Sequence, residues 1–239
     1  MTAQETQLIG KGLYAIAEAA RILRVPTPKL RHWAEGYSFR HRDRACFSPP
    51  VIHAELPVAD GERVLTFLDL MELYFVAKFR GENMSMQYIR AAAAEGIKRF
   101  QTDHPFAVRR FFTDGYRIFA ELDSQKTGSE LPTEELTKRQ LVFNRIVKRF
   151  SKKLDLRMDE VVRYWPLGRR GRVVIDPARS FGKPIDNETG IRTFTLYQAS
   201  LCGDTFEAIA RWYDVPKEAV QCAAKYERSL DRQPKVLFR

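Results

Sequence analysis

Apolar side chains recur at helical spacing near the start of the chain, and the pattern is interrupted once. The first run, YAIAEAARIL, places its apolar residues on one face of a helix and its charged residues on the other. Pro26 and Pro28 then bracket Thr27, a good N-cap with proline at the first helical position. Leu30 and Trp33 begin a new apolar stripe. The pattern therefore predicts two short helices joined by a tight turn.

Such a pair is typical of the helix-turn-helix, whose second helix enters the DNA major groove with its N-terminal residues at the base edges. Arginine can donate two hydrogen bonds to guanine, and threonine at a helix N-terminus can hold a phosphate. The candidate DNA-binding residues of the second helix are Thr27, Lys29, Arg31 and His32. The alternative is an ordinary helical hairpin with a solvated face.

A basic and aromatic run, YSFRHRDR, follows the helix pair. Beyond it, two strand-like segments at 51–54 and 64–66 flank a turn at residues 59–61, which predicts a β-hairpin. A hairpin after a recognition helix is a wing, and basic residues at its base would lie near phosphates or the minor groove. The DNA-binding candidates there are Arg40, His41, Arg42 and Arg44.

Two further helices, capped by Thr66 and Ser85, are predicted to support this winged head. After them, the segment FFTDGYRIFAEL alternates around Asp114 and Gly115. The Asp-Gly pair predicts a second hairpin. We expect this hairpin to close a first domain at residues 1–123.

The polar stretch SQKTGSELP, between Asp123 and Thr133, is the predicted linker to a second domain at residues 133–239. The helix that Thr133 begins has a basic face over residues 138–153, for which exposure to solvent is the common explanation. Near the end, TFEAIARWYDVPKEAVQCAAKYE has a second helix-turn-helix shape. Its second helix offers Glu218 where a base reader would offer a cation or an amide, which favours packing or protein interaction.

Together these elements predict a mainly α-helical α+β fold with small β-hairpins: an N-terminal winged helix-turn-helix and a C-terminal helical domain with a helix-turn-helix-like pair. The 239 residues carry a formal net charge of +10, which suits a polyanionic partner. No segment approaches the roughly 20 apolar residues that cross a bilayer, so we expect a cytoplasmic protein without membrane contact. The three cysteines lack ligand spacing, so we expect no disulfide framework, metal site or cofactor.

The sequence does not contain an evident catalytic constellation. The four histidines are scattered, and no G-x-S-x-G, H-E-x-x-H or P-loop pattern occurs. The carboxylate pairs, Glu134-Glu135 and Asp159-Glu160, are adjacent in sequence and do not converge on one point if they are helical. We therefore expect no enzyme activity, while a nucleic-acid enzyme assembled by tertiary convergence stays an alternative.

Two regions resemble known families. The paired helices, hairpin and two following helices are similar to the MerR-like winged helix-turn-helix over roughly the first hundred residues. The C-terminal region resembles a domain of prokaryotic antitoxins with a "DP…FG.P" opening, a "G-x-R" turn and "IA..Y.V…V..A..Y". Those elements are here Asp176-Pro177, Phe181-Gly182, Pro184, Gly190-Ile191-Arg192, Ile209-Ala210, Tyr213, Val215, Val220, Ala223 and Tyr226. The combination resembles a VapB-type antitoxin of a type II toxin-antitoxin pair.

The resemblance implies a PIN-type ribonuclease toxin as partner, a magnesium-dependent enzyme with a carboxylate cluster, and repression of the chain's own operon through double-stranded operator DNA. Basic residues of the C-terminal tail could lie against such carboxylates while apolar ones fill a groove. The toxin-binding candidates are Arg232, Lys235, Val236, Leu237, Phe238 and Arg239. A disordered end is the alternative interpretation of this tail.

Readers of palindromic operators are usually dimers, so we expect a homodimer or a higher hetero-oligomer with toxin. The alternative function is a stand-alone MerR-like transcriptional regulator. That regulator would bind DNA without a protein partner, whereas an antitoxin requires a stoichiometric toxin.

Overall fold

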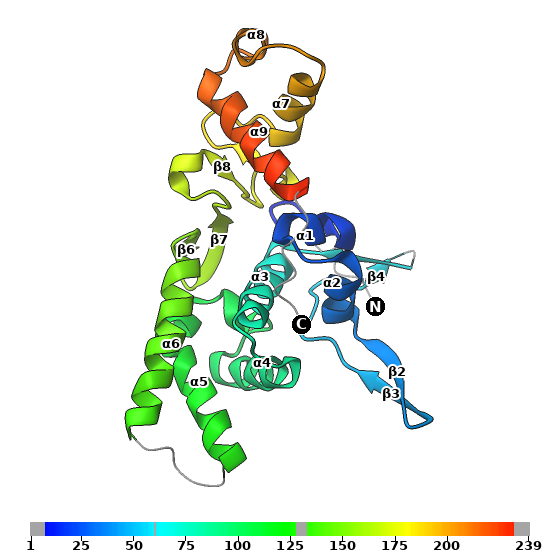
Figure 1. The fold of residues 1–239 in the computed structure, drawn as a ribbon, viewed down its shortest axis with the longest axis vertical. Coiled ribbons are helices and arrows are strands. Elements are labelled where there is room, and N and C mark those ends of the chain that lie inside the picture. Colours follow the sequence, from blue (N-terminus) through cyan, green and yellow to red (C-terminus); the bar gives the residue numbers. More distant parts are fainter. Residues whose placement is uncertain (1–7, 60, 128–132, 232–239) are drawn as a thin grey trace, which may run out of the picture. The chain divides into compact units, whose positions relative to one another are not determined.

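The computed structural model describes residues 8–231, except residue 60 and residues 128–132 (Figure 1). These residues divide into two compact units. The N-terminal unit holds 14–127, 133–152 and 156–161, and the C-terminal unit holds 8–13, 153–155 and 162–231. No helix within the described ranges is long and apolar enough to cross a membrane.

The predicted helix pair is present as α1 (Ile16–Leu23) and α2 (Thr27–Glu35), preceded by the strand β1 (Tyr14–Ala15). Arg24 ends α1 in the left-handed conformation, with φ 56°, and the Val25 N–H donates back to the Ala20 carbonyl at 3.0 Å. Pro26 occupies the N-cap position of α2, so Thr27 is the first helical residue rather than the cap. The break at Val25-Pro26 is therefore a tight turn.

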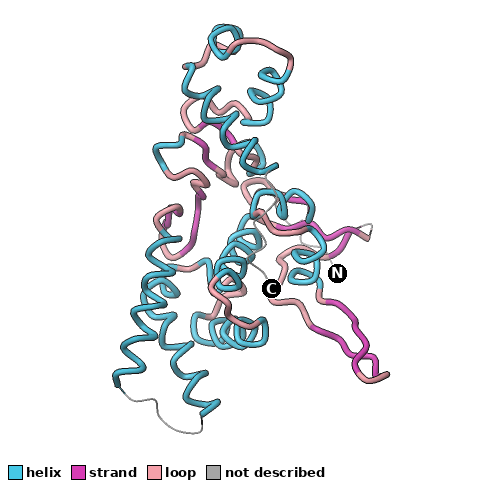
Figure 2. Tube along the Cα trace, in the orientation of Figure 1, coloured by secondary structure: helices cyan, strands magenta, loops and turns pink. Residues whose placement is uncertain are grey.

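Two β-hairpins follow α2 (Figure 2). They are formed by β2 (Tyr37–His41) with β3 (Arg44–Ser48), and by β4 (Val58–Ala59) with β5 (Glu62–Leu65). Strand β5 also pairs with β1, so the second hairpin completes a three-stranded antiparallel sheet in the order β1-β5-β4. The first hairpin lies outside this sheet and extends away from α2 (Figure 1). We call β2–β3 the basic hairpin.

The predicted wing is confirmed only in part. Ala59 pairs with Glu62 across the expected turn, but residues 51–54 are not a strand. Val51 and Ile52 are buried instead, and the Val51 N–H donates to the Trp33 carbonyl at 2.8 Å. The basic and aromatic run was predicted only as a charged segment, whereas it is itself a hairpin.

Four longer helices of the N-terminal unit are described: α3 (Phe67–Gly81), α4 (Met86–Phe100), α5 (Arg109–Thr127) and α6 (Thr133–Ser151). The predicted capping box is present, because the Thr66 hydroxyl accepts the Asp69 N–H at 3.3 Å and Asp69 Oδ2 accepts the Thr66 N–H at 2.9 Å. The Ser85 hydroxyl caps α4 by accepting the Tyr88 N–H at 3.2 Å. Most residues of α3 are buried, which makes it the central helix of the unit.

The predicted hairpin at Asp114-Gly115 is wrong, because these residues lie inside α5. Phe111, Gly115 and Ile118 are also spaced as on one face of a helix. Over so short a run, the repeat of a helix and the alternation of a strand fit the same apolar residues. A Cβ on Gly115 would come within 2.7 Å of Phe111 and 2.9 Å of Phe143. The glycine therefore permits close packing of α5 against α6 and does not make a turn.

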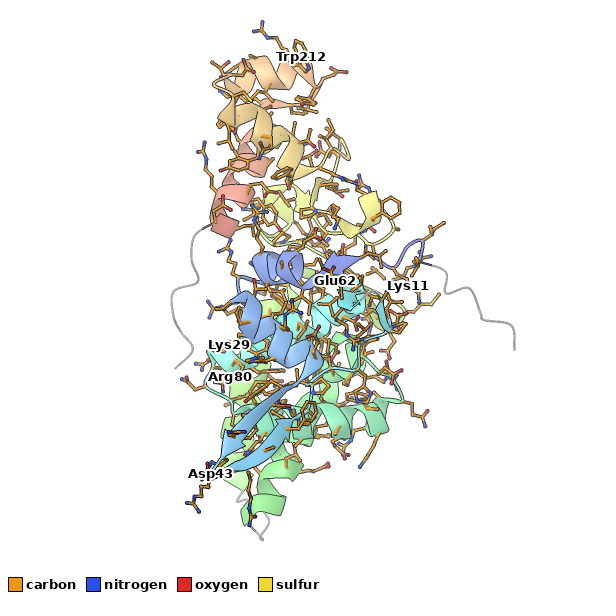
Figure 3. All side chains as sticks on the ribbon, turned by 90° about the vertical axis from the view of Figure 1, so that its right-hand side faces the viewer. Lys11, Lys29, Asp43, Glu62, Arg80 and Trp212 are labelled. Atoms are coloured by element: carbon orange, nitrogen blue, oxygen red, sulfur yellow. The ribbon has the colours of Figure 1, made fainter. Side chains whose placement is uncertain are left out.

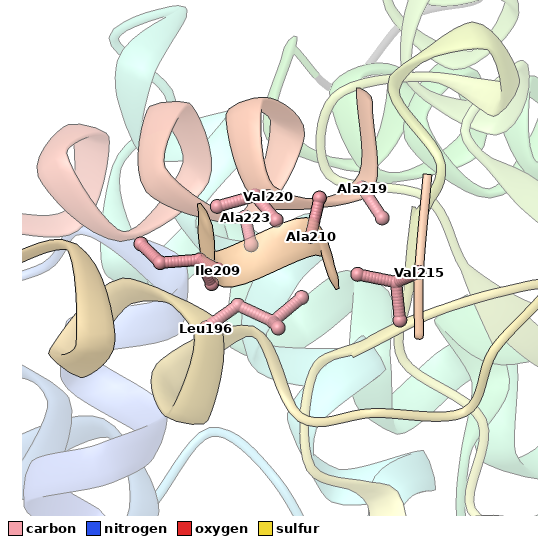
Figure 4. Close-up of a cluster of buried hydrophobic side chains, with 7 residues drawn as sticks. All are labelled: Leu196, Ile209, Ala210, Val215, Ala219, Val220 and Ala223. Carbon is pink, nitrogen blue, oxygen red and sulfur yellow. The ribbon is translucent and has the colours of Figure 1, made fainter. Parts of the chain in front are cut away.

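From residue 154 on, the chain forms two short antiparallel strand pairs and then three helices. These elements are β6 (Leu154–Arg157), β7 (Glu160–Tyr164), β8 (Val173–Val174), β9 (Ile185–Asp186), α7 (Thr193–Leu201), α8 (Phe206–Trp212) and α9 (Lys217–Asp231). Short 3-10 turns lie at Pro105–Ala107 in the N-terminal unit and at Arg169–Gly171 and Ser180–Gly182 in the C-terminal unit. Figure 4 shows the core shared by α7, α8 and α9, where Leu196, Ile209 and Val220 meet. The predicted second helix-turn-helix shape thus has its own packed core.

The boundary between the two units does not fall at the predicted linker. Helix α5 continues to Thr127, past the expected domain end at residue 123, and α6 lies in the N-terminal unit although it was placed in the domain 133–239. The division falls instead within β6 and β7. The physical reason is visible in the aromatic contacts, because Phe143 of α6 packs against Phe111 and Phe119 of α5 at 5.5 Å between ring centroids.

Candidate nucleic-acid interface

Helix α2 has an apolar face that packs against the N-terminal unit and a polar face that is exposed. Leu30, Trp33 and Ala34 are buried, so α2 has one orientation against the N-terminal unit. Arg31 and His32 are exposed, whereas Thr27 and Lys29 are half-buried near the start of the helix. Because the Pro26 cap makes no side-chain hydrogen bond, the first N–H groups of α2 are not satisfied by that cap. The predicted reader residues therefore all lie on α2, on or next to its exposed surface.

Arg31 is held in a weak intrahelical pair. Its Nη1 lies 3.5 Å from Glu35 Oε2, one turn along the helix, and its side chain is 52% exposed. Exposed pairs of this kind contribute about 0.3–0.5 kcal/mol. The guanidinium can therefore exchange this carboxylate for another acceptor at little cost.

Lys29 lies close to a cation from another helix. Burial, and then the charge of Arg80 on α3, lower the pKa of the Lys29 ammonium. Figure 3 shows the two labelled residues on the same side of the unit. Two neighbouring cations at the start of a helix favour an anion between them, since the helix N-terminus also attracts negative charge.

The basic hairpin is exposed along nearly its whole length. Its turn is made by Arg42 and Asp43, whose φ values of 45° and 63° are what a two-residue mirror-image turn requires. His41 pairs with Arg44 directly below this turn, and Arg40 pairs with Ala45. The four predicted basic residues are thus gathered at the tip of one hairpin, beside the labelled Asp43 (Figure 3).

Aromatic contacts join the basic hairpin to α2. The His32 ring stacks on Tyr37 at the base of β2 with centroids 4.3 Å apart, and Tyr37 in turn contacts Phe39 at 5.7 Å. Phe39 and Phe47 are exposed on the two strands. A side chain of α4 also holds the base, because Arg90 Nη2 donates to Ser48 Oγ at 2.9 Å.

The sequence analysis missed several residues that shape this surface. Arg80 and Arg90 come from α3 and α4, and no local pattern connects them with α2. Tyr37 and Phe39 were visible as aromatic residues in the basic run, with Phe47 just after it, and the alternation of Tyr37 and Phe39 with polar residues was the signal of a strand. Folding brings these five residues together with the predicted readers or the basic hairpin.

The other candidate residues have a different outcome. The six predicted toxin-binding residues, 232 and 235–239, lie outside the described part of the chain. The second helix pair, α8–α9, exposes residues of both signs, and the Lys217 ammonium pairs with the Glu207 carboxylate. Within the described residues, no group of histidine, cysteine and carboxylate side chains could hold a metal ion.

Comparison with known proteins covers both units. A family model described as "Putative DNA-binding HTH domain" matches residues 12–93, which contain α1, α2 and both hairpins. The chain is 30% identical over 220 residues to "Putative antitoxin VapB45" of Mycobacterium tuberculosis, over 88% of this chain and 92% of that protein. The X-ray structure of Rv2018 from the same organism matches with a TM-score of 0.66 and 26% identity, over 88% of this chain and 96% of that chain. The chain belongs to the VapB antitoxin family and carries a helix-turn-helix DNA-binding domain of the transcription-regulator type.

Proposed function

We propose that this antitoxin binds its own operator with α2 in the major groove and the basic hairpin on the neighbouring backbone or minor groove. The observation that carries the proposal is the stack of His32 on Tyr37, which joins the helix and the hairpin into one surface. Arg31 is the proposed base reader, because its exposed guanidinium can donate two hydrogen bonds to guanine. Bound to the operator, the chain represses transcription of its own operon.

The phosphate contacts are assigned by charge and position. Lys29 and Arg80 share one phosphate near the N-terminus of α2, together with the Thr27 hydroxyl, because two cations and a helix N-terminus attract an anion. Arg40, His41, Arg42 and Arg44 follow the backbone from the hairpin tip. These contacts position the protein, while Arg31 supplies sequence preference.

The protein partner is a PIN-type ribonuclease toxin, and the antitoxin inhibits it. Support comes from the family, whose M. tuberculosis relative is named an antitoxin, and from the basic and apolar composition of the tail. Arg232, Lys235 and Arg239 are proposed to neutralise the toxin's carboxylates, with Val236, Leu237 and Phe238 in an adjoining groove. The antitoxin acts as a homodimer, since a palindromic operator presents two equivalent half-sites.

Purification of the tagged chain from its own host tests this assignment. A stoichiometric partner that cleaves RNA with magnesium only after the antitoxin is removed is the expected result. A variant that lacks residues 232–239 should bind operator DNA like the full chain but no longer inhibit the partner. A chain that is isolated alone yet retains specific DNA would instead identify a stand-alone regulator.

A further inference from the structure

The C-terminal helix pair repeats the turn of the N-terminal pair residue by residue. The corresponding residues are Ala20 and Ala210, Arg21 and Arg211, Val25 and Val215, Pro26 and Pro216, and Leu30 and Val220. Asp214 has φ 52° where Arg24 has φ 56°, and the Val215 N–H donates to the Ala210 carbonyl at 2.9 Å, as Val25 does to Ala20 at 3.0 Å. Each helix pair can therefore be used to interpret the other.

The two first helices differ in what covers them. Helix α1 packs against α3 and β5 as well as α2, and its Ile22 is only 6% exposed. The corresponding residue of α8 is Trp212, which is 86% exposed (Figure 3). Helix α8 packs against α7 and α9. A large apolar side chain thus projects into solvent from α8 at a position that is buried in α1.

A cleft of about 350 Å³ lies beside this tryptophan. It is lined by Ala199, Cys202, Asp204, Ala208, Ile209, Trp212 and Tyr213. The neighbouring Leu201 of α7 is 57% exposed, so the apolar surface continues past the rim. One face of the unit therefore carries both a projecting indole and a cleft that is largely apolar.

The charges around the cleft distinguish between partners. Asp204 and Asp214 are exposed close to the cations Arg211 and Lys217, and Lys217 is paired with Glu207. A surface of mixed sign does not suit DNA or a cluster of carboxylates, both of which favour a basic surface. Mixed charges do suit a copy of the same surface, because an acid that meets a base of the second copy across a two-fold axis is matched by the same pair on the other side of the axis.

We propose that the surface of α7 and α8 around Trp212 is the dimer interface of this antitoxin, and that each Trp212 enters the cleft of the second copy. A two-fold interface must be complementary to itself, and a knob beside a hole meets that requirement. The inference deepens the homodimer of the proposed function and rests on it.

Sedimentation velocity of the full chain tests the interface. Trp212→Glu should weaken self-association by about tenfold or more, because a buried tryptophan at an interface centre is a typical hot spot. Met158→Glu is the matched control, since Met158 is 88% exposed and does not line the cleft. It should leave self-association unchanged. Circular dichroism establishes that both variants fold.

A second measurement needs no substitution. Cys202 lines the cleft, so alkylation of its thiol should slow as the wild-type concentration rises and a dimer forms, while Cys46 of the basic hairpin should not respond. A wild-type chain that stays monomeric overturns the homodimer itself. A dimer that Trp212→Glu leaves intact overturns only the assigned surface. Loss of toxin binding in that still-dimeric variant would assign the surface to the toxin instead.

Discussion

The helix pairs α1–α2 and α8–α9 turn in the same way but lie in different surroundings. In both, a left-handed residue is followed by a buried valine and a proline, and the next helix buries one aliphatic residue completely. After α2 the chain forms a basic hairpin, whereas α9 runs on for 15 residues as an amphipathic helix. The two pairs therefore share one type of turn, while the exposed residues of each pair determine what it can bind.

The exposed residues of the two second helices show this difference. Arg31 of α2 corresponds to Gln221 of α9, and both are exposed. Arg31 shares α2 with Lys29, which lies near Arg80, and the basic hairpin follows that helix, while Glu218 lies one turn before Gln221. A glutamine can read adenine, yet Lys217 on the same helix is paired with Glu207 and Glu218 adds a negative charge. Fewer cations are therefore available there for the phosphate contacts that supply most of the affinity for DNA.

The largest expected effect on stability comes from Leu30, the fully buried residue of α2. Leu30→Ala should lower the free energy of unfolding by about 2–5 kcal/mol, because it leaves a cavity at a fully buried position. Val220→Ala, the matched change in α9, removes fewer atoms and should cost less. Urea denaturation with hydrogen exchange over α1–α2 and α7–α9 measures both. A loss below about 1 kcal/mol for Leu30→Ala would contradict the packing described.

The helix that covers α1 should give the N-terminal unit a pH dependence. Burial raises the pKa of Glu72 on α3 well above its usual value near 4.5; hydrogen bonds from the Phe106 and Ala107 N–H groups oppose this shift, and the Asp69 charge adds to it. The folded state then retains a proton that the unfolded state has lost. Stability should fall as pH rises from about 4.5 towards the raised pKa, by up to about 1.4 kcal/mol per pH unit.

Glu72→Gln should remove most of this slope, because the amide keeps an acceptor oxygen for the two N–H groups without an ionisable proton. Urea denaturation at a series of pH values measures the slope. The exposed residue Glu82 provides the control variant Glu82→Gln. An unchanged slope in Glu72→Gln would show that another group causes it.

The beginnings of the two pairs also differ. The Thr205 hydroxyl caps α8 by accepting the Ala208 N–H at 3.2 Å, whereas Ala15, at the same position before α1, offers no side-chain cap and lies in strand β1. Thr205→Ala should therefore destabilise the C-terminal unit by about 1 kcal/mol. Thermal unfolding checks this value, with Thr205→Ser as the control that keeps the hydroxyl. Equal losses in both variants would argue against a capping role.

The smallest expected effect concerns a single phosphate contact. Arg42→Ala, at the tip of the basic hairpin, should weaken binding to all DNA sequences alike and reduce the slope of log K against log salt by about 0.9. Lys225→Ala, an exposed cation of α9, should leave that slope unchanged. Fluorescence anisotropy at several salt concentrations measures both. An unchanged slope in Arg42→Ala would contradict the proposed phosphate contact.

Local signals predicted much of this architecture. The break at Val25-Pro26, the capping box at Thr66 and the pair α8–α9 follow from patterns within a few residues. The basic hairpin was missed because its turn, Arg42-Asp43, lacks the Asn-Gly or Asp-Gly signal, and α5 was misinterpreted because it contains that signal. The position of Arg80 beside Lys29 depends on tertiary packing and could not be found from neighbouring residues.

The central claim is that only the first of the two helix pairs reads DNA. Anisotropy with the DNA upstream of the chain's own gene, and with an unrelated duplex, tests it directly in Arg31→Ala and Gln221→Ala. We expect Arg31→Ala to lose about 1–3 kcal/mol on the operator and most of its preference over the unrelated duplex, and Gln221→Ala to bind as the wild type does. Loss of preference in Gln221→Ala, with Arg31→Ala unaffected, would contradict the account.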